Sequence, residues 1–261
     1  MNLDLRGKNA LVCGSSKGIG KAAAVEIAKL GANVTLVSRS ADTMAAIVHE
    51  LEDSQGQRHD FLVADFSKPS DLKRKVRGLV GAKPIHILVN NTGGPPAGPI
   101  LEAEEQAFQE AFTRHLICNH LLVQAVVPGM KKEGYGRIIN VISTSVKAPL
   151  DNLGVSNTVR AAVANWAKTL ANELGPEGIT VNNILPGATN TGRLQEIIEN
   201  KAKASGRSTG EVIAAMQAGI PLRRFAKPEE TGAAIAFLAS PAAAYITGVA
   251  LAVDGGRLKN M

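Results

Sequence analysis

The chain has 261 residues, of which 45% are hydrophobic and 20% charged, and its formal net charge is +6 at pH 7. This composition excludes a disordered or fibrous chain, and the length predicts one large domain over residues 1–261. The two cysteines, Cys13 and Cys118, lie in separate apolar segments, so neither a disulfide framework nor a cysteine-bound metal is expected. We therefore predict a site without a metal ion.

The positive charge favours phosphates or acidic partners, but it does not indicate nucleic-acid binding. Basic residues are scattered, and aromatic residues make up only 3% of the chain, too few for a base-stacking platform. Residues 1–8 are charged and lack the apolar core of a signal peptide, and no apolar run approaches the roughly 18 residues that span a bilayer. We expect a cytoplasmic protein that binds a small molecule, without nucleic acid or membrane.

Short apolar runs alternate along the chain with longer helical patterns, as is typical of a parallel sheet covered by helices. The predicted strands span residues 9–13, 33–38, 60–64, 85–89, 137–142, 180–185 and 250–253. The predicted helices span residues 20–30, 41–54, 69–79, 102–130, 155–174 and 229–239. The sequence therefore predicts a doubly wound α/β fold with a seven-stranded parallel sheet and helices on both faces.

Residues 188–227 interrupt this alternation with two polar helical pieces, 194–204 and 209–218, and no strand between them. The segment follows the carboxyl end of a strand, where doubly wound folds bind their ligands, so we predict a substrate lid. Glycines at 187, 206 and 219 offer hinges for it. An irregular surface insertion is the alternative.

A glycine-rich loop joins the first predicted strand to the first predicted helix. Glycine lets the backbone turn tightly and approach a pyrophosphate, which the free N–H groups at a helix start stabilise. The position between strand and helix is the context that a dinucleotide site requires. We predict that the loop residues Gly14, Ser16, Lys17, Gly18, Ile19 and Gly20 contact a dinucleotide cofactor.

The second predicted strand ends at Ser38 and Arg39. Folds that prefer NAD usually place an acid there, whereas an arginine can bind the 2′-phosphate of NADP(H) with paired hydrogen bonds. Lys17 adds a second positive charge at the end of the neighbouring strand. The sequence therefore favours NADP(H) over NAD(H), the alternative being that both are solvated surface charges.

Asp65 and Phe66 follow the third predicted strand, and a turn of small residues, 90–94, follows the fourth. Both segments fall on the edge of the sheet that carries the glycine loop. An acid there can accept from the adenine amino group, and small residues let the dinucleotide lie flat. We expect Asp65, Phe66, Asn91, Thr92 and Gly93 to contact the cofactor, although each segment alone would be an ordinary turn.

These motifs together resemble the short-chain dehydrogenase/reductase family, and within it the β-ketoacyl-[acyl-carrier-protein] reductases. The resemblance covers nearly the whole chain. It runs on through segment 136–140 to Ser143, through 181–182 to Pro186, and ends at 246–248 and 253–256. It implies one NAD(P)-binding domain of the Rossmann type and a homotetramer or homodimer built through the two long helices. It also implies cofactor contacts from Pro186, Gly187, Thr189, Thr191 and Arg160.

The catalytic positions of the family are only partly matched. Members of the family use a tyrosine, a lysine four residues later, a serine on the preceding strand end and an asparagine in the long helix before it. Ser143 matches the serine, while the other positions hold Ser156, Arg160 and His115. Ser156 donates hydrogen bonds but is a poor acid, and Arg160 can bind ribose hydroxyls but cannot relay a proton. The resemblance implies an atypical active site made of these four residues.

The proton donor is the open question at such a site. His115 is attractive because its ordinary pKa near 6.5 suits proton transfer at neutral pH, but a packing histidine is the alternative. Lys147 and Asp151, after Ser143, are further candidates. Tyr135 and Tyr245 cannot replace the missing tyrosine, because each precedes its strand and so lies at the opposite sheet edge.

Three functions are compatible with the predicted fold. We expect an NADP(H)-dependent oxidoreductase that acts on a carbonyl or an alcohol, with an acyl thioester as one candidate substrate. The alternative is an inactive NADP(H)-binding sensor or scaffold, because the tyrosine and lysine are lost while the binding loop is kept. Dehydration or isomerisation on the same fold has no positive support from any residue.

Overall fold

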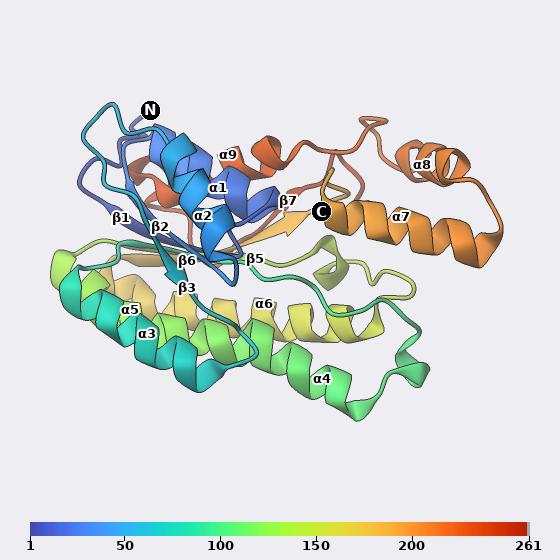
Figure 1. Cartoon of the computed structure of the whole chain (residues 1–261), viewed down its shortest axis with the longest axis horizontal. Coiled ribbons are helices and arrows are strands. Elements are labelled where there is room, and N and C mark those ends of the chain that lie inside the picture. Colours follow the sequence, from blue (N-terminus) through green and yellow to red (C-terminus); the bar gives the residue numbers. More distant parts are fainter. Residues whose placement is uncertain (260–261) are drawn as a thin grey trace.

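The computed structural model describes residues 1–259 and contains a single parallel sheet within them (Figure 1). The strand order is β3-β2-β1-β4-β5-β6-β7, and each neighbouring pair is parallel. The strands are β1 (Asn9–Cys13), β2 (Asn33–Ser38), β3 (Asp60–Val63), β4 (Ile87–Asn90), β5 (Gly136–Val141), β6 (Ile179–Pro186) and β7 (Ala250–Val253). The predicted doubly wound α/β fold with seven parallel strands is confirmed.

The helices cover both faces of this sheet. They are α1 (Gly18–Lys29), α2 (Ala41–Glu50), α3 (Pro69–Ala82), α4 (Glu105–Phe112), α5 (Cys118–Glu133), α6 (Gly154–Leu174), α7 (Gly192–Ser205), α8 (Thr209–Ala218) and α9 (Pro228–Ala239). In Figure 1, α1, α2 and α9 lie on one side of the sheet, and α3, α5 and α6 lie on the other.

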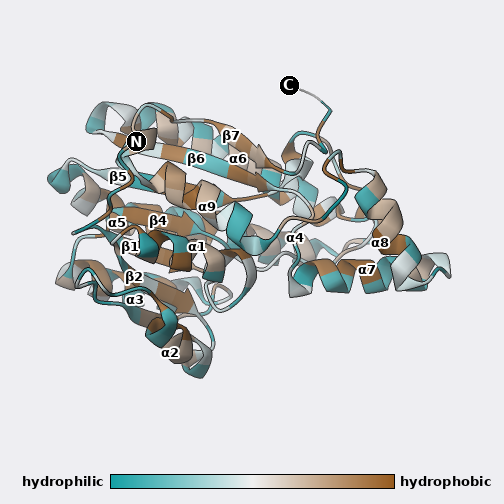
Figure 2. Cartoon of the chain, turned by 90° about the horizontal axis from the view of Figure 1, so that it is seen from above, coloured by the Kyte–Doolittle hydropathy of each residue, from teal (hydrophilic) through white to brown (hydrophobic). Residues whose placement is uncertain are grey.

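Two apolar clusters fill the spaces between the sheet and its helices. Ile27, Met44 and Ile235 bring α1, α2 and α9 into one cluster, while Leu72 and Leu122 bring α3 and α5 into the other. All five side chains are fully buried. Figure 2 shows the hydrophobic residues concentrated in the central strands and an alternation of polar and apolar residues along the outlying α7. Burial of both faces explains why the strands are continuous apolar runs.

Several predicted boundaries were wrong. The predicted helix 102–130 begins later, as α4 at Glu105, and is interrupted by a π-helical turn at Thr113–Ile117 before α5. The predicted helix 41–54 ends at Glu50, because Leu51 is extended and Gly56 turns the chain with a φ of +83°. The predicted strand 85–89 pairs instead as Ile87–Asn90, where Asn90 meets Asn140 of β5.

Residues 188–226 form an excursion from the main body whose two ends lie side by side. Asn190 N–H donates to Ala226 O at 2.8 Å, and Ala226 N–H donates to Ala188 O at 2.9 Å. The predicted polar pieces are α7 and α8, which share a small core of their own built on Leu194 and Val212. The excursion forms the lobe at the right of Figure 1.

No helix within residues 1–259 combines the length and the apolar character that a bilayer crossing requires.

Candidate active site

The glycine loop between β1 and α1 is packed tightly against the turn that follows β4. Gly14 and Gly18 have φ values of +60° and +57°, which favour glycine. A Cβ atom on Gly20 would lie 2.2 Å from Gly14 O, so no larger residue fits there without a shift. Asn91 Nδ2 donates to Gly14 O at 3.2 Å and to Cys13 O at 3.3 Å. The predicted loop therefore depends on Asn91 for its shape.

The start of α1 can receive an anion. Among residues 1–259, no side chain caps this helix, and Lys21 N–H is the first to bond back, to Lys17 O at 3.4 Å. The backbone N–H groups of Gly18, Ile19 and Gly20 before it belong to the uncapped first turn. Across the cleft, Thr191 Cγ2 would lie 3.2 Å from a Cβ on Gly18. A cradle of free N–H groups with little side-chain bulk fits a pyrophosphate.

The end of β2 carries the predicted 2′-phosphate residues. Ser15, which the sequence pattern did not indicate, ties the glycine loop to β2, because Val37 N–H donates to Ser15 Oγ at 2.9 Å. Lys17 and Arg39, which follow β1 and β2, are both exposed at this edge. The pKa of Asp65 lies below its usual value, chiefly because Ser67 N–H donates to the carboxylate, with Arg39 and Lys68 contributing.

A buried ladder of asparagine amides aligns the carboxyl halves of three central strands. Asn90 Nδ2 on β4 donates to Asn140 Oδ1 on β5 at 2.8 Å. Asn140 Nδ2 donates in turn to Asn183 Oδ1 on β6 at 3.1 Å. All three residues are buried, so the ladder has little freedom to slip. The turns after β4, β5 and β6, which carry most of the predicted site, are thereby held in register.

Ser143 follows β5, and Arg160 on α6 bonds to the last residue of that strand. Ser143 Oγ accepts a hydrogen bond from Ser145 N–H at 3.0 Å, which leaves its own hydroxyl proton free to donate. Arg160 on α6 donates from Nη1 to Val141 O at 2.8 Å, two residues before Ser143. Ser156 lies one helical turn before Arg160 and is half-buried. Burial lowers the pKa of Arg160 to about 10, with Arg193 adding to the shift, so the guanidinium stays charged at neutral pH.

His115 lies in the π-helical turn and bonds to the loop after β4. Its Nδ1 is 2.5 Å from Thr92 Oγ1, and the side chain is buried. Burial holds the pKa of His115 well below 6.5, and the nearby charges of Arg160 and Arg114 lower it further. The imidazole of His115 is therefore neutral at neutral pH.

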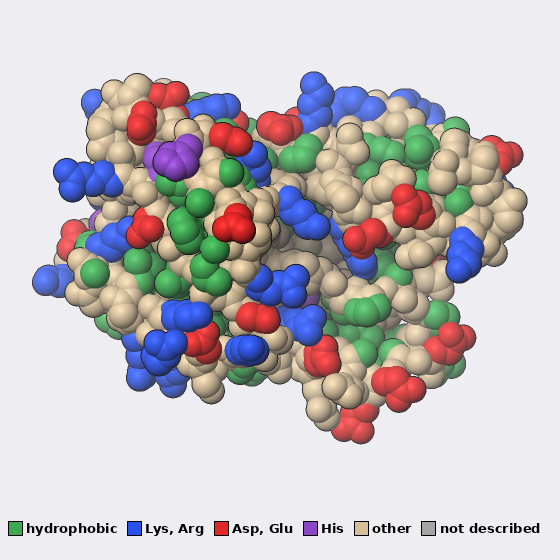
Figure 3. All heavy atoms as spheres, viewed as in Figure 1, with side chains coloured by type: hydrophobic (Ala, Val, Ile, Leu, Met, Phe, Trp, Pro, Cys, Tyr) green, Lys and Arg blue, Asp and Glu red, His purple; other side chains and the backbone are tan. Residues whose placement is uncertain are grey.

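Arg193 is a residue of this region that the sequence pattern did not indicate. It is the second residue of α7, and its Nη2 donates to Pro95 O at 2.7 Å. A Cβ on Gly94 would lie 3.9 Å from Arg193 Nε, so the guanidinium runs alongside the turn that follows β4. A basic residue two positions after Thr191 was the only sign of it in the sequence. Figure 3 shows Lys and Arg side chains gathered around the hollow between the α7–α8 lobe and the main body.

The remaining predicted residues lie along the same sheet edge. Gly187 is pressed against Asp254, whose Cα would lie 2.7 Å from a Cβ on Gly187. Gly93, in contrast, faces open space, because nothing described lies within 4 Å of where its Cβ would stand. Thr189 is buried. The others are half-buried in the loops or at the strand ends: Ser16, Ser38, Phe66 and Pro186. Lys147 and Asp151 are exposed in the loop after Ser143.

The two tyrosines lie away from this edge, as predicted. Tyr135 directly precedes β5, and its hydroxyl donates to Ala239 O at 2.6 Å at the end of α9. Its ring packs against the side chains of Lys8 and Arg137, with their charged groups 4.4 and 4.1 Å from the ring centre. Tyr245 is exposed before β7. Neither can take the place of a catalytic tyrosine at the opposite edge.

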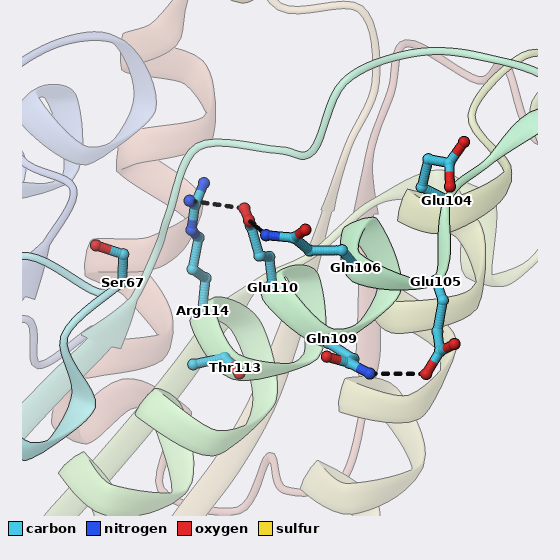
Figure 4. A pocket seen from close by; sticks show the side chains of 8 residues that line it. All are labelled: Ser67, Glu104, Glu105, Gln106, Gln109, Glu110, Thr113 and Arg114. Atoms are coloured by element: carbon cyan, nitrogen blue, oxygen red, sulfur yellow. Dashed lines mark hydrogen bonds and ion pairs between the residues drawn. The ribbon is translucent and has the colours of Figure 1, made fainter.

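A separate hollow of about 600 Å³ lies on the outer side of α4 (Figure 4). None of the predicted site residues lines it. Its side chains satisfy one another, as Arg114 pairs with Glu110 at 3.0 Å and Gln109 donates to Glu105 at 2.8 Å. We regard it as a polar helix surface beside the site and assign it no chemistry. Its lining residues are Ser67, Glu104, Glu105, Gln106, Gln109, Glu110, Thr113 and Arg114.

The fold and the glycine loop define a dinucleotide-binding α/β protein, and comparison with known proteins gives its family. A family model described as enoyl-(acyl carrier protein) reductase matches residues 14–257. The 3-oxoacyl-[acyl-carrier-protein] reductase FabG of Vibrio cholerae is 33% identical over 97% of this chain and 98% of its own. The NADPH-dependent reductase BacG of Bacillus subtilis is 29% identical over 97% and 99% of the two chains.

Solved structures agree. L-sorbose reductase from Gluconobacter frateurii, solved with NADPH and L-sorbose, matches with a TM-score of 0.93 at 33% identity, and each chain is covered completely, at 100%. The chain therefore belongs to the short-chain dehydrogenase/reductase family of NAD(P)-dependent oxidoreductases.

Proposed function

We propose that the protein is an NADP(H)-dependent oxidoreductase that reduces a carbonyl or oxidises the corresponding alcohol. The observation that carries the proposal is the placement of the uncapped start of α1, the cations at the end of β2 and the Ser143 hydroxyl along one sheet edge. NADP(H), when bound there, supplies or takes up a hydride. The family membership and the NADPH named for two relatives support the same interpretation.

The preference for NADP(H) rests on charge. Arg39 and Lys17 offer positive charges where an extra phosphate on the adenosine ribose would lie, and no acid stands directly at the end of β2 to accept from the ribose hydroxyls. Asp65, kept ionised by the N–H of Ser67, suits the adenine amino group. The loop residues Asn91, Thr92 and Gly93 leave room beside it for a flat dinucleotide.

Ser143 polarises the substrate oxygen in this proposal. Because Ser143 Oγ accepts from Ser145 N–H and its hydroxyl proton is not otherwise used, that proton is available to the oxygen that becomes an alkoxide. Ser156 adds a second hydroxyl, and the Arg160 charge stabilises the developing negative charge and binds ribose hydroxyls. These residues stand where the family has its tyrosine and lysine.

The proton must come from another group. Ser156 is a poor acid, Arg160 holds its proton, and His115 is neutral and so has no readily released proton at neutral pH. Water held at Ser143 and Ser156 is then the donor, with Thr92 and His115 available to pass a proton on. We expect slower turnover than a tyrosine would give.

A second candidate is an NADP(H)-binding protein that senses or scaffolds without turnover. In its favour, the family resemblance implies a tyrosine and a lysine at the positions of Ser156 and Arg160, and Arg160 already gives a hydrogen bond to Val141. The cofactor would then regulate the lobe of α7 and α8, which lies beside the site.

We also propose that the protein is a homotetramer or homodimer. The edge strand β7 exposes the apolar side chain of Leu251, and the segment before it exposes Tyr245 and Val249. An exposed apolar sheet edge is suited to contact with a second copy of the chain.

The test is turnover by the NADPH-loaded protein over a broad panel of carbonyls, followed by cofactor absorbance. We expect measurable oxidation of NADPH that Ser143→Ala lowers by roughly 100-fold, the usual effect of losing one hydrogen-bond donor to a developing oxyanion. Ser70→Ala, on the exposed start of α3, is the control and leaves the rate unchanged. Tight NADPH binding without turnover on any carbonyl would instead favour the sensor.

A further inference from the structure

Arg160 is a buried cation without a buried anion. Its side chain is only 8% exposed, and the one hydrogen bond that it makes within residues 1–259 goes to the neutral carbonyl of Val141. Within the same residues, no carboxylate forms an ion pair with it. Burying a guanidinium in this way is unfavourable unless an anion compensates the charge. The remaining donors of Arg160 are therefore available to a bound ligand.

Arg193 brings a second positive charge to the same place from another element. The charge of Arg193 lowers the pKa of Arg160, and Arg193 Nη2 is held by Pro95 O at 2.7 Å in the turn after β4, the strand next to β5. Arg193 Nη1 pairs with Glu196 at 3.2 Å, but the two side chains are 37% and 59% exposed, so this solvent-accessible pair contributes little. Two mutually repelling guanidinium groups at the ends of the central strands favour an anion between them.

The anionic groups of the cofactor have other partners. The start of α1 suits the pyrophosphate, and Arg39 and Lys17 suit the 2′-phosphate, whereas the nicotinamide end carries only an amide and hydroxyl groups. Figure 3 shows Lys and Arg side chains around the hollow between the α7–α8 lobe and the main body. An anionic group on the substrate itself fits this remaining place.

We propose that Arg160 and Arg193 bind a carboxylate of the substrate, and hence that the substrate is a short oxo acid or its hydroxy acid. The inference rests on the proposed function and specifies its substrate class. Arg160 is anchored to Val141, two residues before Ser143, so a carboxylate held by Arg160 places a nearby carbonyl at the Ser143 hydroxyl. A neutral thioester would leave the buried guanidinium of Arg160 uncompensated.

The experiment measures binding of matched acids and amides by calorimetry. The probes are pyruvate, acetoacetate and levulinate, which are 2-, 3- and 4-oxo acids, each compared with its own amide. They are titrated into wild type, Arg193→Gln and Arg160→Lys, with and without saturating NADPH, and NADPH binding is measured on every variant. Arg77→Gln, on the exposed face of α3, removes the same charge away from the site and is the matched control.

We expect at least one acid to bind roughly tenfold or more tightly than its amide, as for a hydrogen-bonded ion pair. Arg193→Gln reduces that preference to within about threefold and leaves NADPH affinity within about twofold, and Arg77→Gln changes neither. Arg160→Lys keeps the charge but loses the paired geometry, so it keeps only part of the preference.

Two results would overturn the inference. One is equal binding of every acid and its amide. The other is an acid preference that survives Arg193→Gln while NADPH binding weakens, because the pair would then serve the cofactor. If the proposed function is wrong, NADPH does not bind at all. A preference of the cofactor-free protein for an acid over its amide would still support the carboxylate site in that case.

Discussion

Close contact between residues far apart in the sequence shapes the cofactor loop. The glycines at 14 and 20 and the side chain of Asn91 occupy one small volume, in which a single added methyl group has no room. The loop pattern in the sequence predicts that glycine is needed there, because strand, loop and helix follow in order. The partner Asn91 lies about seventy residues away and is set by the pairing of β1 with β4.

Gly20→Ala tests this packing. The new Cβ would lie 2.2 Å from Gly14 O and 2.7 Å from Asn91 Nδ2, so the loop must shift, and we expect NADPH affinity to fall by roughly tenfold or more. Gly78→Ala on α3 is the control, because nothing described lies within 4 Å of its Cβ. It should raise the free energy of unfolding by about 0.5–1 kcal/mol. Affinity is read by titration and stability by denaturation; unchanged NADPH binding in Gly20→Ala would contradict the proposed loop.

Because His115 is neutral in the folded protein, the stability of the fold depends on pH. Its folded-state pKa lies well below the ordinary histidine value of 6.5, chiefly because of burial. The unfolded chain therefore binds a proton that the folded chain does not. The contribution of His115 to stability is full above pH 6.5 and is lost as the pH falls below it.

We expect the melting temperature of wild type to fall more steeply than that of His115→Asn between pH 6.5 and about pH 5. His86, whose pKa burial also lowers, is present in both proteins, so its effect cancels in the comparison. The measurement is thermal denaturation at closely spaced pH values. Parallel pH profiles for the two proteins would show that His115 is not the group whose proton binding differs between the folded and unfolded chains.

The sequence pattern predicted which residues lie at the carboxyl ends of the strands, but it did not indicate the residues that the excursion contributes. Arg39, Asp65 and Ser143 each follow a predicted strand, and parallel strands bring such positions together. Arg193 lies on the excursion, whose path no strand pattern fixes, so its bond to Pro95 was invisible in the sequence. The low pKa of His115 also depends on burial, which only the fold determines.

At the scale of elements, the interruption of the long helix before β5 is tied to the site. The π-helical turn Thr113–Ile117 brings His115 to Thr92 in the loop after β4. The apolar pattern of residues 102–130 is continuous enough to predict one helix, because a π turn adds a residue without changing the composition. The turn was therefore not predictable from periodicity.

The excursion behaves as a small unit with its own supports. Ser208 caps α8 by accepting from Glu211 N–H at 3.3 Å, while Glu211 Oε2 accepts from Ser208 N–H at 2.9 Å. Its core of Leu194, Ile198, Ala202 and Val212 is separate from the two clusters against the sheet. We therefore propose that this unit opens locally without disturbing the sheet, as a substrate lid over residues 188–227 would.

Ser208→Ala removes the cap and should cost about 1 kcal/mol of local helix stability. We expect faster amide hydrogen exchange within Thr209–Ala218 and unchanged exchange in the central strands. Ser205→Ala is the matched control, because its hydroxyl donates to Lys201 O and caps nothing. Faster exchange spreading to β5 or β6 would show that the excursion does not open independently.

At the scale of the whole molecule, seven parallel strands place every predicted cofactor segment on one edge. This is why a one-dimensional alternation of strands and helices predicted the fold and the edge on which the proposed cofactor residues lie. The net charge of +6 does not by itself indicate where on the molecule an anion binds. A defined positive region forms only where the fold brings Lys17 and Arg39 to neighbouring strand ends.

The most direct measurement of the central claim is calorimetric binding of NADPH and NADH to wild type and Arg39→Asp. We expect wild type to prefer NADPH and Arg39→Asp to lose that preference, because an acid repels the 2′-phosphate and accepts from ribose hydroxyls. Arg58→Asp makes the same charge change at the opposite end of the β2–β3 pair, beside Asn33, and should leave the preference intact. Equal binding of both cofactors by wild type, or no binding of either, would contradict an NADP(H)-dependent oxidoreductase.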